Sequence, residues 1–322
     1  MHFTHHLQFG ADTNSPCKLE APSCLFFHPP SQQLLVYDSQ SLHRLQYLGA
    51  RLPLLLDDAC EGRLPGDICS LVASYAIDLT TAPFELCSKE DVSGFSVRNV
   101  LQLTRAIAVS PCGTYTALAG EGLCVKHRKS DSVLLPREGG CDARRKSMWL
   151  EQLNIRGMAF CPLGRLFVCE PQLVRVFQLI SANSFAELNR FSISTRQLPD
   201  PTRDFHFRCI AIAGDGTVYV GDARQRCVYV FDAEGVLLRI FQHREVGMVS
   251  SMALSPDDQW LALSFVSCAA ILLFHRSSPA NLSDPARRNK LHCTFEPSQL
   301  CFLADGALCM LDQGKSQLVV HY

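Results

Sequence analysis

The sequence lacks the features that place a chain in a membrane or on a polyanion. None of its stretches approaches the roughly 20 uninterrupted apolar residues that span a bilayer. The first ten residues, MHFTHHLQFG, have no basic start followed by an apolar run, so we expect no secretory signal there. Lys and Arg number 30 against 31 Asp and Glu, so no overall field attracts nucleic acid or anionic lipid. We expect a soluble protein that binds no membrane.

The chain also lacks any CxxC pair, although it holds 16 cysteines among its 322 residues. This absence argues against the usual zinc and thioredoxin-like motifs. Many cysteines stand inside apolar runs, where a thiol behaves as a small core residue; examples are Cys24, Cys161, Cys169 and Cys301. We expect reduced, buried thiols, no metal or cofactor, and a reducing compartment, the cytoplasm or the nucleus.

No catalytic motif stands out. The sequence contains neither the nucleophile elbow GxSxG nor the phosphate-binding GxxxxGK[ST]. We therefore expect that the protein is not an enzyme.

What the sequence does contain is an internal repeat. Residues 208–241 alternate through an apolar run, a GDG turn, TVYVGD, a polar turn, CVYVFD, an EG turn and VLLRIF. Four short strands joined by tight turns form one blade of a β-propeller. Similar units begin near residues 22, 105, 156 and 249, and residues 298–322 supply three further strands.

The missing fourth strand of the last unit has a candidate at the other end of the chain. Residues 2–9 form an orphan strand before the first unit. Pairing it with residues 298–322 would close the ring and remove the exposed sheet edges. The sequence thus predicts one all-β domain over 1–322, a six-bladed β-propeller closed by the N-terminal strand.

Two units resemble a known repeat. Residues 9–48 carry a leading FG, an apolar-x-x-Pro entry, a strand ending in Asp38 and then HR before an apolar pair, which resembles an NHL repeat. The unit at 208–241, with VYVGD and a following Arg226, resembles it too. Glu170 and Asp312 copy the aspartate, whereas Ser264 and Gly120 stand there in other blades. A WD40 ring is the alternative, but the GH…WD signature is absent.

Residues 57–103 do not fit the repeat, and we interpret them as an insertion after the first blade. LPGDICSLVASYAIDL places apolar side chains at helical spacing over about 66–79, after a first-turn Asp67; these are Ile68, Leu71, Val72 and Tyr75. The pattern LPxDIxxLxxSY resembles the opening helix of an F-box, which implies a substrate receptor of a ubiquitin ligase. The alternative is a helix that packs against the ring.

One position recurs just before each inner strand. Aligning the units there places serine in three blades and arginine in three consecutive ones, namely Ser23, Arg105, Arg156, Arg208, Ser250 and Ser298. Such residues rim one mouth of a propeller channel. A guanidinium group suits carboxylates and phosphates, so we expect the mouth to attract an acidic peptide or a phosphate-bearing ligand. Each arginine could instead pair with a loop carboxylate such as Asp204 or Glu151.

Other propeller functions find weaker support in the sequence. The opening residues resemble lactonases of the SMP30 class, with Glu20 at a metal-binding position, but arginines occupy the later ligand positions. Peptidyl-amidating lyases need several channel histidines, and only His206 directly precedes an inner strand. Basic runs at 126–129, 143–146 and 286–290 carry little aromatic interleaving apart from Trp149, which argues against RNA binding.

The sequence therefore predicts a non-catalytic scaffold that binds protein, through the arginine-bearing mouth or through residues 57–103. A substrate-recognition subunit of a ubiquitin ligase and an RNA-binding propeller are the alternatives.

Overall fold

A computed structural model describes about two thirds of the chain. The described residues are 6–9, 19, 22–38, 41–47, 84–91, 106–119, 123–127, 133–134, 154–181, 184–242, 247–266, 268–276 and 288–321.

The described strands form six antiparallel four-stranded sheets, and five of them use strands that are consecutive in the chain. The first sheet contains β2 (Pro22–His28), β3 (Gln33–Asp38), β4 (Ser41–Tyr47) and β5 (Phe84–Asp91). The second contains β6 (Ala106–Val109), β7 (Tyr115–Ala119), β8 (Leu123–His127) and β9 (Val133–Leu134). The third contains β10 (Gly157–Phe160), β11 (Leu166–Cys169), β12 (Val174–Ser181) and β13 (Ser184–Phe191).

The fourth sheet contains β14 (Phe207–Ile212), β15 (Val218–Asp222), β16 (Cys227–Phe231) and β17 (Leu237–Gln242). The fifth contains β18 (Val249–Leu254), β19 (Trp260–Phe265), β20 (Ala270–His275) and β21 (Arg288–His292). Two short 3₁₀ turns, Pro29–Ser31 and Thr195–Gln197, lie between strands.

The remaining sheet joins the two ends of the chain. It contains β22 (Gln299–Phe302), β23 (Leu308–Asp312) and β24 (Gln317–His321), and its outermost strand is β1 (His6–Phe9). β1 pairs with β24 from His6 opposite His321 to Phe9 opposite Leu318. The predicted pairing of the N-terminal strand with the C-terminal strands is therefore confirmed.

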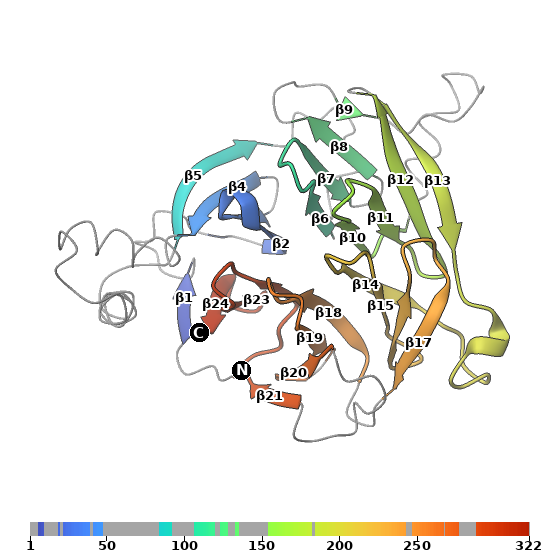
Figure 1. Ribbon diagram of the computed structural model, residues 1–322. Helices are drawn as coiled ribbons and strands as arrows, with labels where there is room; N and C mark the ends of the chain where they lie inside the picture. The colour runs from blue at the N-terminus through green and yellow to red at the C-terminus, as the bar shows by residue number, and fades with distance from the viewer. Residues whose placement is uncertain are drawn as a thin grey trace.

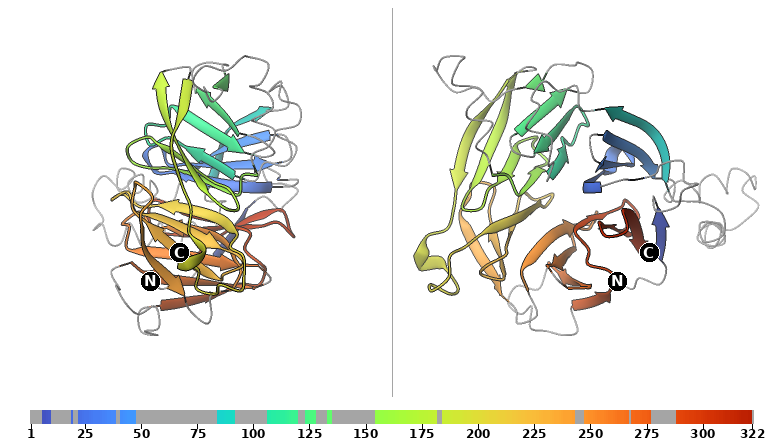
Figure 2. Two further views of the ribbon diagram at one scale, coloured as in Figure 1. Left: turned by 90° about the vertical axis from the view of Figure 1, so that its right-hand side faces the viewer. Right: turned by 180° about the vertical axis from the view of Figure 1, so that it is seen from behind.

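The sheets stand around a central axis (Figure 1). Their inner strands contact one another in the order β2, β6, β10, β14, β18 and β22, and β22 contacts β2 again. Figure 2 shows the same ring from the side and from behind. The chain is a β-propeller.

The core is divided among the interfaces between neighbouring sheets. Six clusters of buried apolar side chains each combine residues from two adjacent sheets. Leu34 and Val36 of β3, for example, pack with Leu311 of β23 and Leu318 of β24. The central strands thus present apolar residues on both faces, and β3, β15 and β16 are buried almost throughout.

An acidic residue ends the second strand in several sheets, and it organises the following turn. Asp222 is fully buried, and its carboxylate accepts hydrogen bonds from the backbone N–H groups of His206 (2.9 Å), Arg224 (2.7 Å) and Gln225 (2.7 Å). Burial nevertheless raises the pKa of this carboxyl above its ordinary value. Asp312 receives Lys315 N–H in the same way.

The equivalent residue in the fifth sheet is not the predicted Ser264. Asp222 lies opposite Phe207, and the residue in the same relation to β18 is Phe265, which lies opposite Val249. Ser264 lies opposite Ser251, one position earlier. The sequence alignment was wrong by one residue, because it counted positions along β19 and could not tell which residue of β18 each one lies opposite.

The outer strand of the first sheet also differs from the prediction. The sequence predicts that the first unit is complete before the insertion at 57–103, but the strand that pairs with β4 is β5, which lies inside that insertion. In β5 the apolar Phe84 and Leu86 stand on either side of the charged Glu85, and further charged residues follow at its end, as suits an edge strand. The helix predicted near 66–79 lies outside the described residues.

Among the described residues, no helix has the length and apolar character needed to cross a membrane.

The buried carboxylate of Asp222 gives a direct test of this architecture. Asp222→Ala leaves three backbone N–H groups near the ring without their acceptor, and we expect the free energy of unfolding to fall by about 3–5 kcal/mol. Asp204→Ala is the matched control, because the Asp204 side chain is 82% exposed and forms only a surface ion pair. Urea denaturation followed by circular dichroism measures both, and equal stabilities for the two variants would contradict the assigned role.

Candidate functional site

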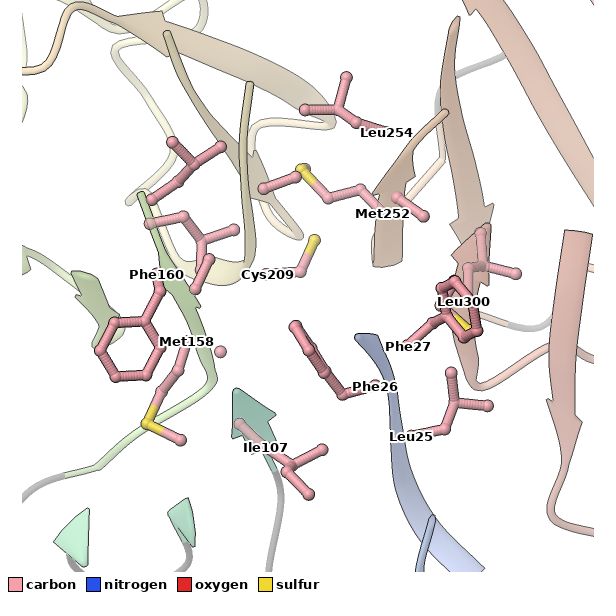
Figure 3. Close-up of a pocket in the computed structure, with 18 of the residues that line it drawn as sticks. Leu25, Phe26, Phe27, Ile107, Met158, Phe160, Cys209, Met252, Leu254 and Leu300 are labelled. Carbon is pink, nitrogen blue, oxygen red and sulfur yellow. The ribbon is translucent and has the colours of Figure 1, made fainter. Parts of the chain in front are cut away.

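A cavity of about 510 Å³ occupies the centre of the ring. Its wall comes from the inner strands of all six sheets and is mainly apolar, as Figure 3 shows. Phe26 extends from β2 into the middle of this space. The labelled wall residues in Figure 3 are Leu25, Phe26, Phe27, Ile107, Met158, Phe160, Cys209, Met252, Leu254 and Leu300.

Prolines surround one end of the cavity. Pro30, Pro111, Pro162 and Pro256 line it and are also exposed, so the cavity opens to solvent here. Leu163, next to Pro162, is 79% exposed, the largest exposed fraction among the described large apolar side chains. We call Pro30, Pro111, Pro162, Pro256 and Leu163 the proline mouth.

Turn geometry explains why proline recurs at this end. After three of the inner strands the chain reverses in a tight turn, whose closing N–H groups belong to Gly113, Gly164 and Asp258 and bond to the carbonyls of Ser110, Cys161 and Ser255. The residue after the one whose carbonyl accepts this bond is proline each time, and its fixed φ suits the second position of such a turn. The closing residues have φ of +68°, +78° and +55°.

His28 connects the first two sheets beside this mouth. It is 5% exposed and lines the cavity. Its Nδ1 lies 2.7 Å from the Ser31 hydroxyl, and its Nε2 lies 3.2 Å from the carbonyl oxygen of Ser110. Neither His28 nor the prolines were predicted as site residues, although in four units of the sequence a proline follows the inner strand at once or after one residue.

The predicted serine and arginine positions lie at the opposite end of the inner strands. Ser23, Arg208 and Ser250 each occupy the extra residue where the register shifts between the first two strands of a sheet. Such a bulge re-aims the side chain of the extra residue. Arg156 and Ser298 directly precede β10 and β22, and their N–H groups bond to Cys169 and Leu311.

These residues share one register position but not one environment. Of the described members, Arg156 and Ser250 line the cavity. Arg208 is half-buried, and the Ser298 hydroxyl donates to the carbonyl of Leu311 at 3.1 Å, a contact within its own sheet. Arg105 lies outside the described residues. Of the three predicted arginines, the structure therefore describes only Arg156 and Arg208.

Positive charge gathers around His206 at this end. Burial lowers the pKa of His206, and Arg156, Arg224 and Arg208 lower it further, while Asp222 opposes them. The carboxylate offered as an arginine partner, Asp204, pairs with Arg224 at 3.2 Å. We call the region of Arg156, Arg208 and His206 the arginine end.

Most described cysteines are buried and free. Cys209 lines the cavity, and burial raises its pKa to about 12. Burial also raises the pKa of Cys24 and of Cys227 to about 12. Cys112, beside Pro111, is exposed, and hydrogen bonds from Ser110 and Thr114 lower its pKa.

Several other predicted site residues lie outside the part of the chain that the structure describes. The insertion residues Ile68, Leu71, Val72 and Tyr75, the lactonase-like Glu20, and Glu151 lie outside it. Within the described residues, no three His, Cys, Asp or Glu side chains gather as a metal ion would require.

Comparisons with known proteins support the fold and give no information on function. No protein-family model matches the chain, and a search of curated proteins finds no match. Among solved structures, the chain is similar to the hydrazine synthase of Kuenenia stuttgartiensis, with 12% sequence identity and a TM-score of 0.53. The match covers 96% of this chain and 98% of that one. At this identity the likeness concerns the propeller fold alone.

The difference in exposure and pKa between Cys112 and the buried cysteines predicts the order in which they are alkylated. At pH 8 we expect iodoacetamide to alkylate Cys112 well before Cys24, Cys209 or Cys227, because the thiolate is the reactive form. Peptide mapping by mass spectrometry after short exposure of the native protein measures the order. The same labelling after urea unfolding is the control, and should remove the difference. Early modification of Cys209 in the native protein would contradict the buried placement.

Proposed function

We propose that this protein is a non-catalytic scaffold, a six-bladed propeller of the NHL type, that binds a protein partner at the proline mouth. The observation that supports this most is that the exposed prolines line an apolar cavity and that the highly exposed Leu163 directly follows one of them, Pro162. A partner side chain that enters this cavity leaves water for an apolar wall, which stabilises a complex by about 1.5–3 kcal/mol per large side chain. Apolar anchors seated in pockets dominate protein interfaces.

Two further observations support the six-blade count and the NHL type. The ring order of the six inner strands supports the blade count. The buried acidic residue that ends the second strand, as in Asp38, Asp222 and Asp312, supports the NHL type. The carboxylates of Asp222 and Asp312 accept hydrogen bonds from backbone N–H groups of the following turn, which is a structural role that suits a scaffold.

Substituting Leu163 tests the proposal. Leu163→Asp places a charge on the most exposed part of the mouth, and we expect at least about a tenfold loss of partner capture, equivalent to about 1.4 kcal/mol. Leu188→Asp is the matched control, because Leu188 is 51% exposed on β13, the outermost strand of the third sheet, and is not among the residues that line the cavity. Affinity isolation with quantitative mass spectrometry compares both variants with the unmodified chain.

Cys112 provides a second readout. Because it stands beside Pro111, a bound partner should slow its alkylation, whereas the Leu163→Asp variant should alkylate equally fast with and without the partner. A partner lost equally from both aspartate variants, or from neither, would contradict docking at the proline mouth.

The same isolation distinguishes the alternatives. Adaptor and cullin subunits whose capture depends on residues 57–103 and not on Leu163 would favour the ubiquitin-ligase proposal. Nuclease-sensitive RNA in the isolate would favour an RNA-binding propeller, through basic residues such as those at 286–290.

A further inference from the structure

Six equivalent turns surround the proline mouth, one from each sheet. In every sheet the chain passes from the first strand to the second through a tight turn that one backbone hydrogen bond closes, with N···O distances of 2.8–3.2 Å. The third residue of the turn is exposed in five sheets and half-buried in the first. In ring order from the first sheet, these third residues are Ser31, Cys112, Leu163, Asp215, Asp257 and Asp305.

The charge at these positions is divided between the two halves of the ring. The first three sheets contribute uncharged side chains, whereas the fourth sheet, the fifth sheet and the sheet of β22, which are neighbours in the ring, each contribute an aspartate. Asp258, which closes the turn of the fifth sheet, adds a fourth carboxylate, and the six four-residue turns contain no Lys or Arg. We call the turns that carry Asp215, Asp257 and Asp305 the acidic side of the mouth.

The Asp257 carboxylate keeps its charge, because its described hydrogen-bond partners are neutral. It accepts a bond from the Ser255 hydroxyl and another, at 3.1 Å, from the Gln259 N–H group. Partial burial acts to raise the pKa of Asp257, but these hydrogen bonds outweigh burial and lower it. Asp257 is thus an exposed anion at pH 7, directly after Pro256 of the mouth.

Neighbouring cations compensate only part of the charge on the acidic side. The Arg276 guanidinium group lies 2.8 Å from Asp215 and 3.9 Å from Asp258, so one arginine faces four carboxylates. Arg165, beside the turn of the third sheet, is bound to Glu234 at 3.1 Å and adds no net charge. The described side chains therefore leave a negative potential on the acidic side.

Turn formation alone does not require aspartate at these positions. Aspartate favours tight turns, because its carboxylate can accept a nearby backbone N–H group, as Asp257 does. The turns of the second and third sheets nevertheless close with the same backbone hydrogen bond and carry Cys112 and Leu163 at the third position. The division of the mouth into an uncharged side and an acidic side is therefore not a consequence of the turn geometry.

We propose that the partner bound at the proline mouth is a basic polypeptide segment, which places an apolar side chain at Leu163 and the cavity and a Lys or Arg side chain at Asp257. This inference rests on the function proposed above and specifies the chemistry of the partner. The apolar side chain is stabilised by leaving water, and the cation is stabilised by the charge of the acidic side. Because the two attractions lie on different sides of the mouth, they also fix the direction in which the segment crosses it.

A partner of the opposite charge is disfavoured at this surface. An acidic segment or a nucleic-acid strand would bring like charge to the acidic side, which lowers affinity. The acidic ligand expected from the sequence concerned the arginine end, which lies at the opposite end of the inner strands. The two ends of the ring thus select ligands of opposite charge.

A random heptapeptide library displayed on phage tests this preference without a known partner. The bait is the purified full-length protein. We expect the selected peptides to combine a large apolar residue with Lys or Arg. The same selection on Leu163→Ser, which removes the apolar side chain and adds no charge, should not enrich them. Thermal melting confirms that each variant is folded.

Fluorescence anisotropy with the most enriched peptide then measures the contribution of Asp257. Asp257→Asn removes the charge and keeps an oxygen acceptor for the turn, and it should weaken binding about threefold, as an exposed ion pair does. Asp257→Lys replaces attraction by repulsion, which doubles the change in binding free energy, so we expect about a tenfold loss. Asp204→Asn is the matched control, because Asp204 is 82% exposed near the arginine end and should leave binding unchanged.

Salt provides a readout that a purely structural role of Asp257 would not change. Raising the ionic strength from about 0.01 M to about 1 M shortens the Debye length from about 30 Å to about 3 Å. The difference in affinity between the unmodified protein and Asp257→Asn should therefore disappear at high salt.

The outcomes separate this inference from the proposed docking site. Selected peptides that lack Lys and Arg, or a basic peptide whose affinity is unchanged in Asp257→Lys, overturn the basic partner. Docking at the mouth still stands in that case if Leu163→Ser abolishes binding. Peptides that bind Leu163→Ser as tightly as the unmodified protein overturn both proposals. A selection that enriches no sequence also overturns the basic segment.

Discussion

Each sheet of this ring has two apolar faces, and neither can be buried within the sheet itself. The fold buries both faces by packing every sheet between two neighbours. The core therefore consists of clusters at the interfaces between sheets and has no single centre. This requirement fixes the closed arrangement, because an open row would expose a face at either end. The central cavity follows from the same geometry, since inner strands that meet around an axis cannot all reach it.

The composition of the cavity depends on small irregularities in the inner strands. Where the register shifts at Ser23, Arg208 and Ser250, one residue is added before the regular alternation begins. The bulge separates a polar position at the strand start from the apolar residues that follow. Polar side chains therefore collect at one end, while prolines collect at the other, where tight turns need them. The two ends of the cavity owe their different chemistry to the two different ways in which an inner strand begins and ends.

Much of the strand arrangement could be predicted from sequence, because alternating apolar runs bounded by Gly, Pro and Asp are local features. The equivalence of Arg156 and Arg208 also followed from aligning the inner strands. The fourth strand of the first sheet could not be placed, because β5 is far along the chain from β4 and only its pairing identifies it. Ser264 was misplaced because the alignment counted residues along β19, whereas the pairing partner on β18 shows that Phe265, opposite Val249, is the equivalent residue. The apolar cavity was missed because its lining depends on side-chain direction, which strand alternation alone does not fix.

The sheet that combines β1 with β22, β23 and β24 has a consequence for how the chain acquires its structure. β1 is synthesised long before its partner β24, and their pairing has the largest sequence separation among the described strand pairs. Contacts of high sequence separation form slowly, because the intervening chain must lose much of its freedom before they can form. During that interval β1 is an unpaired strand, open to association with other chains. Ring closure is thus expected to be the slow, aggregation-sensitive step, and a circular permutant that joins β24 directly to β1 would convert it into a local one.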